Sequence, residues 1–110
     1  MLTFMKLSGL VRTVNDPELH YTTSKKPVVE FTVASNRQWT DEGGSKHEET
    51  CFLDCTCFAR LAEAVDKHVF KGDPLYIEGR LKLERWESDG QKRSKHSLAV
   101  EKVIFLKPKD

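Results

Sequence analysis

The chain has 110 residues, a length that suits a single domain with one hydrophobic core. Its 18 basic and 17 acidic residues leave a formal net charge of +1, so no global excess of positive charge indicates a polyanionic ligand. The sequence holds no apolar run of the roughly 20 residues that a membrane span needs, and no signal segment. It predicts a soluble, cytoplasmic protein of small β or α+β type without membrane contact.

The first part of the chain predicts two long strands with a short one between them. Residues 2–14 are largely apolar around Gly9, where the glycine predicts a bulge or bend. A turn signal at residues 15–17 precedes a short strand over residues 18–21. Residues 28–39 form the second strong strand, whose core face is Val29, Phe31 and Val33.

Trp39 falls in phase with the core residues of this strand but lies near its loop end. We therefore expect a twist or bulge after Ser35 rather than a buried Trp39. A polar loop over residues 40–48, with two glycines, leads into the next strand.

Residues 49–59 alternate with large rings on the polar side of the strand. The apolar face comprises Cys51, Leu53, Cys55, Cys57 and Ala59, and the other face places Phe52 and Phe58 among polar residues. Burial of a Phe contributes about 2 kcal/mol, so two exposed rings forgo stability unless something covers them. Two interpretations stay open: a second sheet or partner subunit covers the rings, or they form a stacking platform for flat ligands.

The period changes at Arg60, and residues 60–72 predict a short amphipathic helix with Gly72 at its C-terminal cap and Pro74 beyond it. Alternation resumes over residues 75–86, with Leu83 on the apolar face and Trp86 on the polar face. A turn at residues 88–90 precedes a last strand over residues 94–106. The order predicts an all-β fold: one domain, residues 1–110, forming a five-stranded Greek-key barrel (OB-fold) with one α-helix between strands 3 and 4.

Rings and basic residues together indicate a surface for single-stranded nucleic acid. Residues 80–95 hold six basic and three acidic residues, a local charge of +3 that suits a phosphate backbone. Bases stack on aromatic faces for about 1–3 kcal/mol each, whereas duplex DNA hides its base faces. The candidate stacking residues are Trp39, Phe52, Phe58 and Trp86, and the candidate phosphate contacts are Arg37, Arg60, Lys71, Lys82, Arg85, Lys92 and Arg93.

The three cysteines do not indicate a metal centre. On an extended strand Cys51 and Cys57 are roughly 20 Å apart, too far for one tetrahedral site, so all three are interpreted as small core residues. No nucleophile stands with a base, and no glycine-rich loop suits a phosphate. We expect no catalytic residue, metal or cofactor, although a thiol or zinc enzyme remains the alternative from another class.

Several segments, in their order and spacing, resemble bacterial single-stranded DNA-binding proteins over nearly the whole chain. They are Asp16-Pro17-Glu18-Leu19, Asn36-Arg37 with Trp39, Glu48-Glu49-Thr50, Leu61-Ala62-Glu63, Lys71-Gly72-Asp73-Pro74, Tyr76-Ile77-Glu78-Gly79-Arg80-Leu81 and Asp89-Gly90. The resemblance implies a five-stranded barrel, a homotetramer (a dimer is the other state considered), and a nucleoid-associated role in replication, recombination and repair. It places the stacking aromatics on Trp39, Phe52, Phe58 and Trp86.

Other features bear on this resemblance. Asp54 and Glu84 put negative charge on polar faces, which is expected to weaken affinity for a polyanion. The sequence ends at Lys107-Pro108-Lys109-Asp110, so we expect neither a C-terminal linker nor an acidic tail, and no tail-mediated recruitment of replication proteins. The alternative function is a primosome or recombination accessory protein that uses the same surface mainly for protein contacts.

Overall fold

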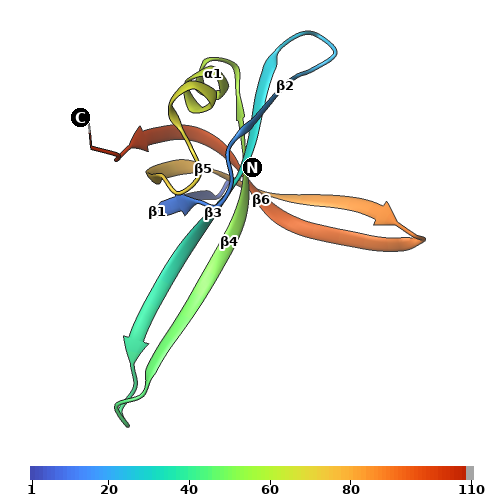
Figure 1. The fold of residues 1–110 in the computed structure, drawn as a ribbon. Coiled ribbons are helices and arrows are strands. Elements are labelled where there is room, and N and C mark those ends of the chain that lie inside the picture. Colours follow the sequence, from blue (N-terminus) through green and yellow to red (C-terminus); the bar gives the residue numbers. More distant parts are fainter. Residues whose placement is uncertain (109–110) are drawn as a thin grey trace.

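The computed structural model describes residues 1–108; the expected chain end at Lys109 and Asp110 lies outside the described residues. Six strands and one helix follow one another along the chain (Figure 1). Their bounds are β1 Lys6–Thr13, β2 Glu18–Tyr21, β3 Pro27–Thr40, β4 Lys46–Phe58, α1 Ala59–His68, β5 Pro74–Ser88 and β6 Gln91–Phe105.

Five strands close into a barrel. The sheet has the order β1-β5-β6-β4-β3-β2. β1 also pairs with β3 through Arg12 and Thr13, and this pairing closes the five strands β1, β5, β6, β4 and β3 into a barrel. The short strand β2 extends the sheet beyond β3. The predicted all-β barrel with one helix before its last two strands is confirmed, because α1 lies between β4 and β5.

The core lies inside the barrel and under α1. Val29, Phe31 and Val33 of β3 are buried as predicted, and Ala62 and Val65 attach the helix to the same cluster. The remaining members are Cys55, Cys57, Val69, Leu75, Ile77, Leu98 and Val100. The prediction of core cysteines is confirmed for Cys55 and Cys57 and is wrong for Cys51, which is exposed.

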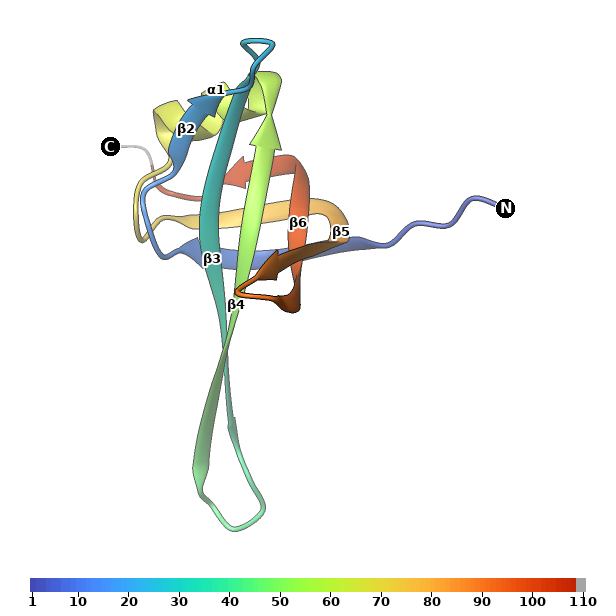
Figure 2. The ribbon, with the colours of Figure 1, turned by 90° about the vertical axis from the view of Figure 1, so that its right-hand side faces the viewer.

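Two hairpins continue beyond the barrel as arms, seen at the lower left and at the right of Figure 1. The β3–β4 arm comprises residues 35–52, and the β5–β6 arm comprises residues 82–96. Figure 2 shows the β3–β4 arm as a long ribbon below the barrel. Because the arms lie outside the core, Cys51 and Leu83 are exposed although their phase is that of the core face, as predicted for Leu83.

The sheet register places its irregularity elsewhere than predicted. The β1–β5 pairing runs without a shift through Gly9, and the β3–β4 pairing runs without a shift past Ser35. Of the predicted bulge or bend at Gly9 and twist or bulge after Ser35, the bulge is therefore ruled out at both positions. The register shifts between Glu78 and Gly79 of β5, where Glu101 is the extra residue of β6. A side chain at position 79 would collide with β6, because an added Cβ would lie 2.3 Å from the carbonyl oxygen of Ala99.

The helix begins where predicted and ends earlier. Ala59 has a φ of 57°, a left-handed conformation that turns the chain from β4 into α1. Val69 is the C-cap, so the prediction of Gly72 as the cap is wrong; Gly72, with a φ of 89°, lies in the turn that follows. In residues 1–108 no helix has the length and apolar character to cross a membrane.

Candidate functional site

One exposed face of the barrel carries most of the predicted site. Directly opposite residues of paired strands share a face, so the parallel register of Asp54 with Ser97 joins β4 to β6 next to the β5–β6 arm. We call this surface the outer face. It comprises Glu30 and Thr32 of β3, Phe52, Asp54, Thr56 and Phe58 of β4, Lys82, Glu84 and Trp86 of β5, and Arg93, Lys95 and Ser97 of β6.

Three of the four predicted rings lie on the outer face and are open to solvent. Phe52 is 65% exposed, Phe58 is 52% exposed and Trp86 is 44% exposed. Single exposed apolar residues are common, but three aromatic rings on one face form a surface on which a flat ligand can stack. Of the two interpretations left open, cover by a second sheet of the same chain is excluded for the residues that the structure describes.

Trp39 lies on the opposite face of the β3–β4 arm. It pairs with His47 in the same alternating set as the core residues, whereas Phe52 and Phe58 belong to the other set. Its ring stacks on His47 with centroids 5.3 Å apart, and the guanidinium of Arg37 lies 4.8 Å from its centroid. Trp39 therefore does not share the outer face with the other three rings.

A carboxylate holds His47 in this stack. Asp41 lies 2.7 Å from Nε2 of His47, and this hydrogen bond, with that from the Ser45 backbone N–H, lowers the pKa of Asp41 below its ordinary value. The stack of Trp39, His47 and Arg37 near the tip of the arm is a contact that the sequence analysis missed. The sequence pattern could have revealed this contact, because alternation along β3 and β4 places Trp39 and His47 on the same face of the hairpin.

The basic residues of the β5–β6 arm divide between its two faces. Lys82 and Arg93 are on the outer face, where Arg93 is directly opposite Trp86. Arg85 and Lys92 are in the alternate set and point to the other side of the ribbon. A depression of about 570 Å³ lies near the turn of this arm. It is lined by Arg85, Trp86, Glu87, Lys92, Arg93 and Ser94.

Two further predicted basic residues lie off the strands. Arg60 is exposed in the first turn of α1, two residues after Phe58, so it stands beside that end of the outer face. Lys71 is in the loop between α1 and β5, where its backbone N–H donates to Asp16. That loop lies on the side of the barrel away from the β5–β6 arm (Figure 1), and the structure does not bring Lys71 to the rings.

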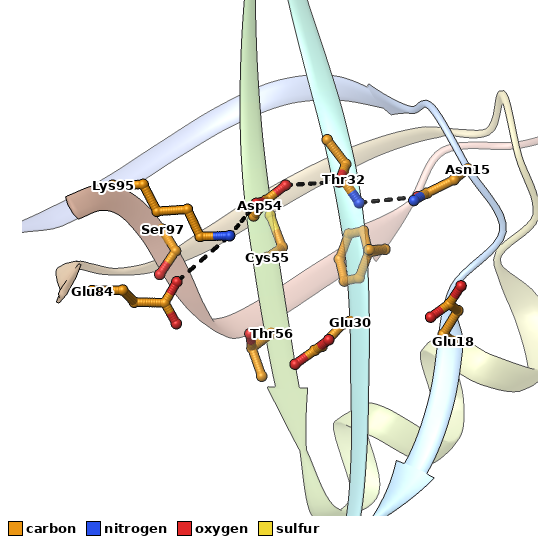
Figure 3. A pocket seen from close by; sticks show the side chains of 11 residues that line it. Asn15, Glu18, Glu30, Thr32, Asp54, Cys55, Thr56, Glu84, Lys95 and Ser97 are labelled. Atoms are coloured by element: carbon orange, nitrogen blue, oxygen red, sulfur yellow. Dashed lines mark hydrogen bonds and ion pairs between the residues drawn. The ribbon is translucent and has the colours of Figure 1, made fainter. Parts of the chain in front are cut away.

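A polar groove lies at the centre of the outer face (Figure 3). Lys95 donates to Asp54 over 2.7 Å, lies 3.8 Å from Glu84, and has its ammonium 5.9 Å from the centroid of the Trp86 ring. Thr32 donates to the other oxygen of Asp54 over 2.8 Å. The hydrogen bonds from Lys95 and Thr32 lower the pKa of Asp54, and the bond to Asp54 raises the pKa of Lys95.

The sequence does not reveal this groove. Lys95 belongs to the basic stretch, and Asp54 and Glu84 stand as isolated charges far apart along the chain. The β5–β6 pairing places Glu84 opposite Lys95, and the parallel pairing of β4 with β6 brings Asp54 to them. Asn15, Glu18 and Glu30 complete one side of the groove, and Phe31, Cys55, Thr56 and Ser97 line its floor and edges.

The alternative of metal or thiol chemistry rests on the three cysteines, of which Cys51 is exposed and Cys55 and Cys57 are buried. In residues 1–108 no group of three or more His, Cys, Asp or Glu side chains is arranged to hold a metal ion. Burial raises the pKa of the Cys55 and Cys57 thiols to about 12, which keeps both protonated and unreactive near neutral pH.

Sequence comparisons agree with the resemblance noted above. The model of the single-strand binding protein family matches residues 6–106. The chain is 41% identical to the single-stranded DNA-binding protein of Wolinella succinogenes and 40% identical to that of Helicobacter hepaticus, in both cases over 86% of the chain. It spans 59% and 56% of the lengths of these two longer relatives.

Solved structures share the fold. The Plasmodium falciparum SSB in complex with ssDNA matches with a TM-score of 0.90 at 20% identity, over 97% of this chain and 98% of the other. A deletion mutant of the single-stranded DNA binding protein from Thermus aquaticus matches with a TM-score of 0.79 at 25% identity, over 93% of this chain and 50% of the other. The likeness covers the barrel together with both arms.

Proposed function

The chain belongs to the single-strand binding protein family, and from that premise we propose that it binds single-stranded DNA without strong sequence preference. Bases stack on exposed rings, and basic side chains neutralise the phosphates. Binding protects exposed strands and removes their secondary structure during replication, recombination and repair. The protein acts as a binder rather than an enzyme, on nucleoid DNA in the cytoplasm.

The observation that carries this proposal is the outer face itself. Phe52, Phe58 and Trp86 are exposed on one continuous surface, with Lys82 and Arg93 on the same side of the β5–β6 arm. Rings interleaved with basic side chains suit single strands, because every base offers a face for stacking. Trp39 and Arg37, near the tip of the other arm, supply a second stacking point on the opposite side of that ribbon.

A titration with poly(dT) tests the proposed function. Trp39 and Trp86 are the tryptophans of the chain, and both are partly exposed on the arms, so stacked bases should quench their emission. We expect saturable quenching and a gel shift with single-stranded DNA, and much weaker binding to duplex DNA of equal length. Unchanged emission together with no gel shift would overturn the proposal.

We also propose that the protein assembles as a homotetramer. Leu10, Tyr76 and Ile104 are directly opposite one another across β1, β5 and β6, on the outside of the barrel. Leu10 is 70% exposed and Ile104 is 42% exposed, and Leu106 is exposed nearby. An apolar row of this kind across three strands is a surface that a second subunit would cover.

A further inference from the structure

We propose that the groove at the centre of the outer face is a nucleobase-edge site that favours bases carrying an amino group. This inference rests on the proposed function and adds a chemical preference to it. The groove is lined by the side chains of Glu18, Glu30, Asp54 and Glu84 and one ammonium group, that of Lys95. Such a lining is unexpected on a surface that binds a polyanion.

The charge of the groove determines which part of a strand faces it. Four carboxylates against one ammonium group repel phosphate, and Lys95 is already engaged by Asp54 at 2.7 Å. Arg93, outside the groove on the same face and directly opposite Trp86, remains for the backbone, whereas Lys82 forms an ion pair with Glu84. A strand that crosses from Phe58 to Trp86 therefore keeps its phosphates outside and turns base edges toward the carboxylates.

A buried hydroxyl in the groove lacks a partner. Ser97 is 2% exposed, and its Oγ is the buried side-chain polar atom without a hydrogen bond in the described part of the chain. Figure 3 shows its hydroxyl directed into the groove beside Glu84. A buried polar group without a partner destabilises the fold, so a ligand that bonds Ser97 removes that penalty.

The Glu84 carboxylate favours bases that carry an amino group. The Glu84 carboxylate lies 3.8 Å from Lys95 and 3.9 Å from Lys82, beyond hydrogen-bond length, and its oxygens are open to a donor. Carboxylates accept from the amino group of cytosine, and adenine and guanine carry amino groups too. Thymine and uracil present a carbonyl oxygen at the corresponding position, which a carboxylate repels.

The size of the groove fits an edge rather than a whole nucleotide. Its volume is about 240 Å³, below the roughly 300–1,000 Å³ of sites that enclose small molecules. The rings of Phe52, Phe58 and Trp86 stack on base faces, and the groove between them contacts the edge of one base. Stacking accounts for general binding and the groove for a modest preference.

Equal-length oligo(dC) and oligo(dU) test this inference, because the two bases differ in the amino or carbonyl group at C4 and in the adjacent ring nitrogen N3, which accepts in cytosine and donates in uracil. Affinities are measured by tryptophan quenching for the wild-type chain, Glu84→Gln and Ser97→Ala. We expect each substitution to lower the ratio of dC affinity to dU affinity roughly two- to tenfold, the range of one hydrogen bond. Glu63→Gln is the matched control, since Glu63 is an exposed carboxylate on α1, outside the groove and the outer face.

The outcomes separate the two proposals. An unchanged ratio in Glu84→Gln and Ser97→Ala, with both oligonucleotides bound, overturns the nucleobase-edge site and leaves the proposed function standing. A ratio that falls equally in Glu63→Gln also overturns it, because general charge would then be the cause. Absence of binding to either oligonucleotide overturns both. If Ser97→Ala changes the unfolding temperature but not the ratio, Ser97 is structural only and the site as proposed is wrong.

Discussion

Phe58 and Phe70 are two aromatic side chains of nearly equal exposure in different surroundings. Phe58 is 52% exposed on the outer face, whereas Phe70 is 54% exposed in the loop after α1, beneath the ammonium group of Lys107. If stacking on the outer face drives binding, Phe58→Ala should cost about 1–3 kcal/mol of binding free energy. Phe70→Ala should change it by much less. Fluorescence anisotropy with a labelled oligonucleotide measures both, and equal losses would contradict the assignment.

Asp54 makes the free energy of unfolding depend on pH in the acidic range. Its pKa in the folded protein is lowered below the ordinary 3.8 by hydrogen bonds from Lys95 and Thr32. A lowered folded pKa means that the stabilising contribution is present above 3.8 and is lost as the pH falls through the folded value. We expect the difference in unfolding free energy between the wild type and Asp54→Asn to shrink as the pH falls through that range.

Urea unfolding at a series of pH values measures this difference. In a Lys95→Gln background, the same Asp54→Asn change should have a smaller effect, because the main partner that lowers the pKa of Asp54 is gone. An effect of equal size in both backgrounds would show that Lys95 is not the cause.

Alternation along a strand predicted the side on which individual residues lie, but not the neighbours they meet. Phe52, Phe58 and Trp86 are exposed as the pattern indicated, because alternation fixes the face of each residue. Ser97 reads from the sequence as an ordinary small residue between His96 and Leu98. Its burial beside Asp54 depends on a parallel pairing between residues 43 positions apart, which local pattern does not encode.

The bulge between β5 and β6 depends on one glycine. Gly79 is buried opposite Val100, and a Cβ there would lie 2.3 Å from the carbonyl oxygen and 2.9 Å from the carbonyl carbon of Ala99. Backbone must move to admit any side chain, so Gly79→Ala should destabilise the fold by about 1–3 kcal/mol. Chemical denaturation measures the change.

Gly43→Ala is the matched control for this substitution. Gly43 is in the loop of the β3–β4 arm, where the nearest atom to an added Cβ is Oδ1 of Asp41 at 3.5 Å. We expect a change within about 0.5 kcal/mol, as for most surface substitutions. Similar destabilisation by both variants would mean that the close approach at the bulge is relieved without cost.

The arms explain why strand ends were the least accurate part of the sequence-based prediction. Beyond Ser35 on β3 and before Leu53 on β4, both faces are exposed, so no apolar period marks these residues as strand. Cross-strand contacts support the pairing instead: Arg37 lies 3.6 Å from Glu49, and Trp39 stacks on His47. The barrel and helix were predictable because they bury an alternating set, and the arms do not.

The whole molecule is more extended than its length suggests. Its radius of gyration is 16.4 Å, compared with about 13 Å for a compact domain of 100 residues, and its extents are 57 × 49 × 36 Å. The excess comes from the two arms, which leave the barrel in different directions (Figures 1 and 2). A ligand that contacts both arms must therefore follow a path around the barrel.

Assembly is tested by placing a charge in the apolar row. Leu10→Glu would put a carboxylate opposite Tyr76, where burial against a second subunit is costly. We expect sedimentation to give a tetramer of 12.6 kDa chains for the wild type and smaller species for the variant. Leu83→Glu, an exposed leucine on the β5–β6 arm, is the control and should leave the mass unchanged. A monomeric wild type would contradict the proposed homotetramer.

The division into a buried barrel and two exposed arms also sets two levels of local opening. Backbone amides of the arms are held by hairpin pairing alone and should exchange with solvent deuterium when the hairpins fray. Amides of the barrel should exchange only on global unfolding. A bound strand that clamps an arm would slow exchange there and leave the barrel unchanged. The pattern of slowed amides would thus act as a footprint, tracing the bound strand over each hairpin.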